Sequence, residues 1–291
     1  MSVLQRLSRP ARDPQIQPQL RAAYAVGLKR AWQHFWRRPV TCFIPSVGLM
    51  RLWPNNTVSF RLGIFEIWEP HITKFIRSRI RDGAVCIDVG ANIGYYSLLM
   101  SRTSPSGKIY AVEPSPKIRA ELDENLRLNG CTNVVVVPYG ISDREEVLAF
   151  RTKEKNHGSS AFMENGDQFL ALKPLASVIP EGDIAKTEIL KIDVEGMEDR
   201  VLGDVLRLLP LFPQHLTICA ELRLDSQIRQ LLESFFNNGF RAIIIKNEYS
   251  SLFYANPKLD QPPTNLQLKD LQPENLQRLP DGMYDIALFR D

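Results

Sequence analysis

Apolar segments of two kinds alternate along most of this chain of 291 residues. Short runs rich in β-branched residues predict strands, and segments with apolar positions three and four residues apart predict helices. Seven runs predict strands: Ala84–Val89, Lys108–Val112, Asn133–Val137, Glu188–Ile192, Leu216–Glu221, Ala242–Ile245 and Tyr284–Phe289. Because helical segments lie between most of them, the pattern predicts a doubly wound α/β fold with a mostly parallel, seven-stranded sheet covered on both faces.

The first 64 residues follow a different pattern and are predicted to form a basic extension of an α/β domain that spans residues 65–291. Residues 1–19 are polar and carry three prolines, which predicts a flexible leader. Leu20 to Trp36 predicts an amphipathic helix, with an apolar stripe of Leu20, Tyr24, Leu28, Trp32 and Phe35. The alternation from Thr57 to Phe60 predicts a short hairpin.

Three later segments do not fit the simple alternation of strands and helices. Val147 to Phe150 predicts an added edge strand, and the polar residues 151–166 predict a loop near the ligand crevice. Residues 249–283 hold five prolines and little periodicity. A loop of that length in a compact domain is usually functional or an insertion.

Charge is distributed unevenly along the chain. Residues 1–82 hold 14 Lys and Arg against 4 Asp and Glu, whereas the remainder holds 22 against 29. A basic arm indicates an anionic partner such as a membrane surface, a phosphorylated carrier or a nucleic acid. Peripheral membrane contact through the basic, Trp-containing helix is one interpretation. The other is that this helix packs on the following domain and its arginines are solvated.

The remaining composition favours a cytoplasmic protein, with membrane association through the N-terminal helix as the alternative. Four cysteines are scattered without paired spacing, which predicts core thiols in a reducing compartment. We find no uninterrupted apolar stretch of about 18 residues, which a spanning helix would need. The N-terminus lacks the apolar core of a secretory signal.

The most informative stretch begins at the strand Ala84–Val89, which is followed at once by Gly90 and Gly94. Glycines at the end of a strand and the start of a helix let the backbone approach a ligand closely. The next strand ends in Glu113, and an acid in that position commonly binds ribose hydroxyls. This order predicts a nucleoside-binding crevice.

The nucleoside is predicted to be S-adenosylmethionine. A dinucleotide site usually carries Gly-x-Gly-x-x-Gly, whereas this turn has one glycine before Gly94 and an acid, Asp88, at the strand end. A carboxylate there repels a pyrophosphate and suits a cation. S-adenosylmethionine offers a sulfonium and an ammonium without phosphate, so it is favoured over NAD.

Ligand chemistry then assigns roles to the residues of this crevice. Glu113 should bind the ribose hydroxyls, and Gly90 and Gly94 should leave room for the methionine part and the ribose. Asn92 is a further hydrogen-bonding candidate, and Asp88 should bind the ammonium, directly or through water. Ser142 and Asp143 follow the third strand. They should either face the adenine amino group or cap a surface turn.

Two motifs resemble those of the FkbM-type family of S-adenosylmethionine-dependent methyltransferases: Asp88-Val-Gly-Ala-Asn-Ile-Gly-Tyr-Tyr-Ser97 and Leu190-Lys-Ile-Asp-Val-Glu-Gly-Met-Glu198. The lead-in Trp68 to Thr73 is also similar, and the resemblance runs from Phe65 to Phe289. It implies a class I, Rossmann-like methyltransferase fold and methyl transfer to an oxygen, such as a hydroxyl of a sugar, glycolipid or other secondary metabolite. It further implies that Asp193 and Glu195 line the cofactor and acceptor pocket. Glu69 is implied to lie close to it, with a simple charge at a helix N-terminus as the alternative.

Methyl transfer to a hydroxyl needs in-line positioning and a base. The candidate bases are Asp193, Glu195 and His157, in that order; His157 is otherwise an ordinary loop histidine. Two carboxylates make a weak metal site, so no metal is predicted. The expected acceptor is a small molecule or a glycan, because the chain has Asp193-Val-Glu-Gly196 where a base-flipping nucleic-acid methyltransferase has an aromatic-proline tetrapeptide. A nucleic-acid or protein methyltransferase, a non-catalytic cofactor-binding scaffold and a NAD-linked oxidoreductase remain as alternatives.

Overall fold

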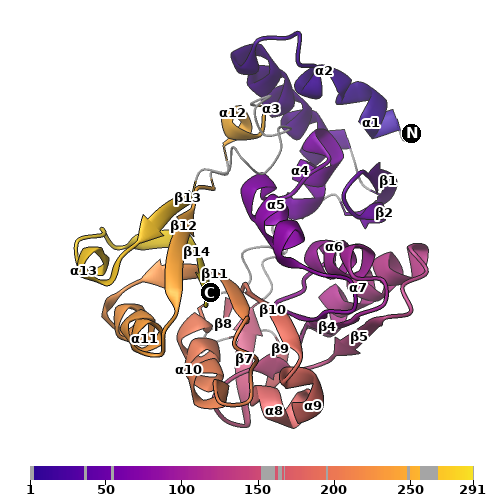
Figure 1. Cartoon of the computed structure of the whole chain (residues 1–291). Helices are drawn as coiled ribbons and strands as arrows, with labels where there is room; N and C mark the ends of the chain where they lie inside the picture. The colour runs from indigo at the N-terminus through magenta and orange to yellow at the C-terminus, as the bar shows by residue number, and fades with distance from the viewer. Residues whose placement is uncertain are drawn as a thin grey trace.

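A computed structural model describes residues 3–35, 38–53, 56–151, 161–162, 166, 168–194, 196–247, 250–255 and 268–290. The centre of the molecule is an eight-stranded sheet with the order β13-β12-β14-β11-β10-β3-β4-β5 (Figure 1). Its strands are β3 (Val85–Val89), β4 (Lys108–Val112), β5 (Val134–Val137), β10 (Thr187–Ile192), β11 (Thr217–Leu224), β12 (Arg241–Ile245), β13 (Leu268–Leu271) and β14 (Gly282–Phe289).

The predicted doubly wound, mostly parallel sheet is confirmed. The strands from β5 through β4, β3 and β10 to β11 pair in parallel, and only the pairs that involve β14 or β13 are antiparallel. All seven predicted strands are present. The eighth, β13, lies in the 249–283 segment that the sequence predicted to be a long loop; its pairing with β12 is non-local and leaves little periodicity in the sequence.

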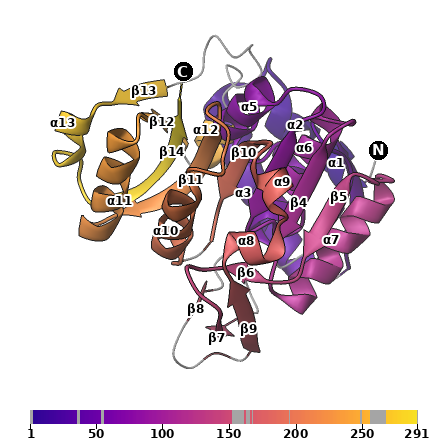
Figure 2. The ribbon, with the colours of Figure 1, turned by 60° about the horizontal axis from the view of Figure 1, so that its bottom comes forward.

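Helices cover the two faces of this sheet, as Figure 2 shows. One face carries α5 (Pro70–Arg79), α6 (Tyr95–Thr103) and α7 (Pro116–Leu128). The other carries α8 (Leu175–Val178), α9 (Glu181–Ile184), α10 (Glu198–Leu208), α11 (Ser226–Asn237) and α13 (Pro273–Leu276). Because successive strand residues point to opposite faces, Ile189 packs with the first group and Leu190 with the second. Two apolar cores result, one on each side of the sheet.

A second, four-stranded sheet is inserted between β5 and β10 and projects from the body in Figure 2. Its strands are β6 (Gly140–Ile141), β7 (Glu146–Arg151), β8 (Ala161–Phe162) and β9 (Gln168–Lys173). The predicted edge strand Val147–Phe150 therefore exists, but it does not extend the central sheet. It pairs with β9, a strand that the sequence pattern did not predict.

The N-terminal extension is more ordered than its sequence predicted. Instead of a flexible leader, residues 3–12 form α1 (Val3–Leu7) and α2 (Arg9–Arg12). Gln5 and Ser8 are buried, and their side chains donate hydrogen bonds to the carbonyls of Phe43 (2.6 Å) and Gly63 (3.2 Å). These long-range bonds tie the leader down, and no local sequence signal shows them.

The predicted N-terminal helix is α3 (Pro18–Phe35). Of the predicted apolar stripe, Leu28 packs against the core, Leu20 and Tyr24 do not belong to the buried face, and the side chains of Trp32 and Phe35 lie outside the described ones. Leu20 is 61% exposed and Tyr24 39% exposed, whereas Arg21 and Ala25 are buried. The helix packs against α2 and against α12 (Ser251–Tyr254), a segment distant in sequence (Figure 1). The small Ala25 permits the close approach that packing requires, so contact geometry overrides side-chain apolarity here.

The hairpin predicted at Thr57–Phe60 is wrong. The hairpin lies earlier, in β1 (Val40–Ile44) and β2 (Gly48–Leu52). Residues Thr57–Phe65 form α4, because the Asn56 side chain caps the helix by accepting a hydrogen bond from the Ser59 amide (2.9 Å). Four alternating residues were too few to distinguish a strand from this buried helix.

Two simpler expectations can be compared with the structure. The cysteines are free thiols, and Cys42, Cys86 and Cys219 are buried, as predicted. Among the described residues, none of the helices combines the length and apolarity needed to cross a membrane.

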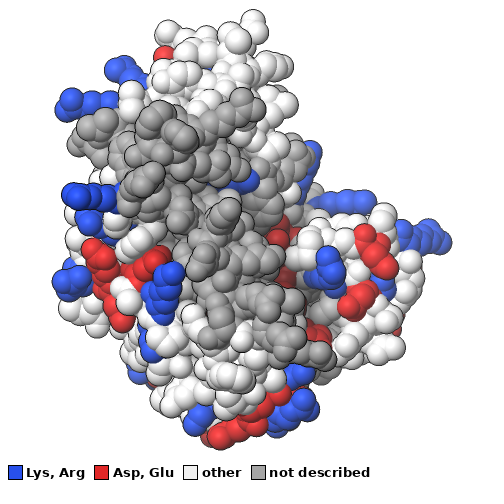
Figure 3. Space-filling view, turned by 180° about the vertical axis from the view of Figure 1, so that it is seen from behind, with Lys and Arg blue, Asp and Glu red and all other residues white. Residues whose placement is uncertain are grey.

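The charge asymmetry of the sequence is visible on the surface. Figure 3 shows Lys and Arg with hardly any Asp or Glu over the upper, N-terminal part, and both signs mixed below.

Candidate active site

The turn after β3 has a backbone conformation that favours glycine at positions 90 and 94. Gly90 has φ +85°, and a Cβ on it would lie 1.9 Å from the backbone carbonyl oxygen of Asp193. Gly94 has φ +92° and immediately precedes α6. Asn92 adopts a positive φ of 50° between them, a conformation that Asn tolerates better than most residues. The result is a tight strand-to-helix turn, as predicted.

Glu113 holds this turn from the neighbouring strand. Its two carboxylate oxygens accept the amide hydrogens of Asn92 (3.1 Å) and Ser115 (2.9 Å). The side chain is buried, and burial raises the pKa of Glu113 to about 7. Each oxygen keeps a further lone pair, so the carboxylate has capacity for a diol. Its assignment to the ribose stays a prediction.

The Asp88 side chain is buried under the turn and is not exposed to the crevice. Its carboxylate is 1% exposed and accepts a 2.6 Å hydrogen bond from the Ser97 hydroxyl on the first turn of α6. Burial raises the pKa of Asp88 to about 6, which the Ser97 bond and Lys191 partly oppose. Asp88 thus joins β3 to α6, and its predicted contact with the ammonium stays a prediction.

A row of polar residues crosses the carboxyl edge of the sheet beside this turn. Val89 pairs with Ile192, and Ile192 with Ala220, so Gly90, Asp193 and Glu221 follow one another across three strands. Glu221 in turn pairs with Asp285 on β14. Residues aligned in this way point to the same face, here the face covered by α5 and α6. Three carboxylates therefore lie side by side at the edge where open α/β sheets bind ligands.

Lys191 is the buried cation of this row. It is 3% exposed, and its Nζ lies 3.0 Å from Asp193 Oδ2 and 4.7 Å from the ring centre of Tyr96. Burial by itself lowers the pKa of Lys191, but the carboxylates of Asp193, Glu69 and Asp88 outweigh it and raise the pKa above the ordinary lysine value. Lys191 therefore stays charged and orients Asp193.

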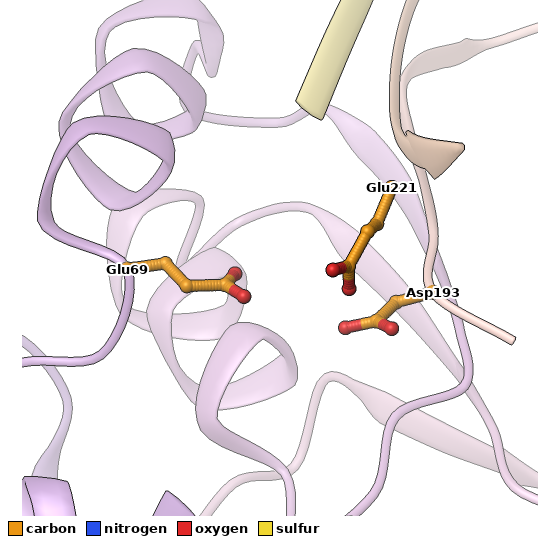
Figure 4. Close-up of side chains that lie close together, drawn as sticks. All are labelled: Glu69, Asp193 and Glu221. Atoms are coloured by element: carbon orange, nitrogen blue, oxygen red, sulfur yellow. The ribbon is translucent and has the colours of Figure 1, made fainter. Parts of the chain in front are cut away.

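Glu69 reaches the same place from the other side. It precedes α5 with φ +40°, is 1% exposed, and its carboxylate accepts a 2.7 Å hydrogen bond from the Tyr96 hydroxyl. Figure 4 shows the carboxylates of Glu69, Asp193 and Glu221 converging, with one oxygen of each within 4.8 Å of the others. The structure thus places Glu69 beside Asp193. Such a triad has the oxygen ligands that a divalent cation uses, but Lys191 already supplies a positive charge there.

Glu221 and Asp285 are the site residues that the sequence analysis missed. Burial, reinforced by the charges of Asp193 and Glu69, raises the pKa of both carboxyls well above their ordinary values. They line a cavity of about 10 Å³ together with Lys191, room for roughly one water. The available signal was an acid inside each of two predicted apolar strands, where an unpaired carboxylate is costly.

Two further predicted site residues, Ser142 and Asp143, follow the end of β5. The buried Ser142 donates its hydroxyl to Glu146 (2.6 Å), which also pairs with Arg200. Asp143 is exposed, and one of its oxygens lies 3.2 Å from the Ser142 hydroxyl. Their proposed contact with adenine stays a prediction. Glu195 and His157 lie outside the described residues.

Comparison with known proteins now decides the family. The model of the methyltransferase FkbM domain matches residues 88–242. The chain belongs to the FkbM methyltransferase family. The match begins at Asp88 and includes the glycine turn, Glu113 and the row from Asp193 to Glu221, so the resemblance noted from the sequence motifs is confirmed. The doubly wound sheet is accordingly that of a class I methyltransferase.

Curated relatives match part of the chain. The 31-O-demethyl-FK506 methyltransferase FkbM of Streptomyces tacrolimicus is 32% identical over 162 residues, covering 43% of this chain and 61% of the relative. The hexuronic acid methyltransferase AglP of Haloferax volcanii is 26% identical over 146 residues, covering 47% and 59%. The chain thus spans about 60% of the length of these relatives. A solved methyltransferase FkbM of Methylobacillus flagellatus KT is 16% identical, with a TM-score of 0.40 over 75% of this chain and 47% of that one.

Proposed function

We propose that the chain transfers a methyl group from S-adenosylmethionine to an oxygen, a hydroxyl of a sugar, glycolipid or other secondary metabolite. The observation that carries the proposal is the register that sets the Gly90 turn next to Asp193 and Glu221. A nucleoside held at the turn has its reactive end beside a row of carboxylates. The family membership supports methyl transfer as the reaction.

The chemistry of the site fits this cofactor. Five buried or half-buried acids, Glu69, Asp88, Asp193, Glu221 and Asp285, surround one buried cation, Lys191. The ionised carboxylates among them attract a sulfonium and an ammonium and repel a pyrophosphate. A bound cation also favours ionisation of Glu221 and Asp285, whose pKa values burial raises. Gly90, Gly94 and Asn92 supply a backbone cradle without Cβ obstruction at its two glycines. In this proposal Glu113 binds the ribose hydroxyls, Ser142 and Asp143 face the adenine, and Asp88 binds the ammonium, directly or through water.

S-adenosylmethionine supplies an activated methyl group when bound. A hydroxyl acceptor would then need a carboxylate of this chain to take its proton as it receives the methyl group. Asp193, Glu195 and His157 are the proposed bases. Asp193 is held by Lys191 at 3.0 Å, which fixes its orientation toward the edge of the sheet.

The oxygen acceptor is supported by the names of two relatives, one for a 31-O-demethyl compound and one for a hexuronic acid. Incubation with methyl-labelled S-adenosylmethionine and fractionated cell extract, followed by identification of the labelled product, tests the proposal. We expect label in a base-stable ether. Label in nucleic acid or protein, or none in any fraction, would contradict it, and calorimetric titration of NAD⁺ beside S-adenosylmethionine tests the cofactor.

A further inference from the structure

A ligand-sized cavity with both apolar and cationic walls lies beside the carboxylate row. It has a volume of about 760 Å³ and lies between the end of β12, the start of β14 and β13, within the size range of small-molecule sites. Ile245 pairs with Asp285 on one side and with Leu268 on the other. Because β12 runs parallel to β11, the cavity opens at the same edge of the sheet as Gly90 and Asp193.

Asp285 connects the cavity to the candidate active site. It lines this large cavity, and it also lines the small cavity that contains Lys191 and Glu221. Asp193 and Asp285 stand two strand positions apart, which corresponds to about 10 Å at the usual strand spacing of about 4.8 Å. A molecule bound in the cavity can therefore reach the methyl-transfer position only if it extends about 10 Å along the row.

The walls of the cavity select for a particular chemistry. Leu268 and Met283 are 41% and 51% exposed and, with Leu279 and Tyr284, form an apolar surface. Lys246 and Lys269 stand in the same lining. Apolar walls beside two cations suit a molecule with an apolar body and an anionic group.

We propose that this cavity binds the methyl acceptor, and that the acceptor is an amphipathic organic anion. Its carboxylate or phosphate pairs with Lys246 and Lys269, its apolar body lies on Leu268 and Met283, and its hydroxyl extends past Asp285 toward Asp193. Identifying the bound molecule as the methyl acceptor rests on the proposed methyl transfer. Binding of an amphipathic anion in the cavity does not depend on it.

The test uses 8-anilinonaphthalene-1-sulfonate, a fluorescent apolar anion, titrated into the full chain. We expect saturable binding that Lys269→Glu weakens by about fivefold or more, since a favourable charge pair becomes a repulsive one. Met283→Glu, at an exposed position of the apolar wall, should weaken it similarly. Lys186→Glu, which reverses an exposed lysine next to α9, is the matched control and should change it less than twofold.

Displacement by decyl phosphate and by decanoate distinguishes the two anionic groups, and displacement by either supports the proposal. Equal binding by wild type, Lys269→Glu and Met283→Glu would overturn it, as would failure of both competitors to displace the dye. Calorimetry with S-adenosylmethionine on the same variants distinguishes a failure of the cavity proposal from a failure of the methyl-transfer proposal. Unchanged cofactor affinity with lost dye binding supports the cavity alone, whereas absent cofactor binding in wild type would refute the methyl-transfer proposal and leave the dye result standing.

Discussion

The Cα of Gly90 lies so close to Asp193 that a Cβ added to it would stand 1.9 Å from the Asp193 carbonyl oxygen. The turn that forms the predicted cofactor cradle is therefore packed directly against the strand end that carries the predicted base. Cofactor binding and orientation of Asp193 depend on the same backbone contact.

Gly90→Ala should consequently damage both stability and binding. The overlap and the positive φ together should lower the free energy of unfolding by about 3 kcal/mol or more, as chemical denaturation can measure. Gly203→Ala is the control, because Gly203 lies in α10 and an added Cβ meets nothing within 4 Å. That variant should be stabilised by roughly 0.5–1 kcal/mol. Equal stability of the two variants would contradict the contact.

Glu113→Ala should weaken binding of S-adenosylmethionine by roughly 1.5–3 kcal/mol, the loss expected for charge-assisted hydrogen bonds. The structure adds a second effect, because the amides of Asn92 and Ser115 also lose their acceptor. Glu113→Gln keeps an oxygen for one of these amides and should fold more stably than the alanine variant. Calorimetry that gives wild-type affinity for Glu113→Ala would remove the ribose assignment.

Stability should fall as the pH rises from about 4.5 to about 7. Burial raises the pKa of Glu113 from its ordinary value of 4.5 to about 7, and that of Asp88 from 3.8 to about 6. In this window the folded state binds more protons than the unfolded state, so deprotonation favours unfolding. Thermal denaturation across the window should show the decline. Glu113→Gln should make it shallower, and an unchanged slope in that variant would show that Glu113 titrates normally.

Lys191→Met should destabilise the fold by roughly 3–5 kcal/mol, because it leaves Asp193 and Glu69 without their buried cation. Adding Asp193→Asn to it should recover part of the loss, since one of the unpaired charges is then removed. A double-mutant cycle by urea denaturation measures this coupling. Additive effects would mean that the 3.0 Å pair contributes nothing to stability.

Asp193→Asn alone should leave binding of S-adenosylmethionine measurable and reduce turnover of the labelled product. The amide still accepts a hydrogen bond from Lys191 but takes up protons far less readily than a carboxylate. Asp199→Asn is a suitable control, because Asp199 lies on the first turn of α10 and contacts Gln227 instead. Full activity of Asp193→Asn would exclude Asp193 as the base.

The sequence by itself determined seven strands of the central sheet, the glycine turn with Glu113, and the family, because each depends on local periodicity or on a contiguous motif. The sequence could not show which side chains meet across strands. Lys191, Glu221 and Asp285 come together only through the register of β10, β11 and β14, and each of them is separated from the others by many residues along the chain.

The structure of the N-terminal extension differs from its sequence-based prediction for a related reason. Its ordering depends on hydrogen bonds from Gln5 and Ser8 to distant carbonyls and on the packing of α3 against α12. Local propensity and apolar spacing predict neither, because burial is decided by the surfaces that meet and not by the apolarity of one of them. The tertiary structure therefore decided the charge environment of the site and the form of the extension, while the sequence decided the fold that holds them.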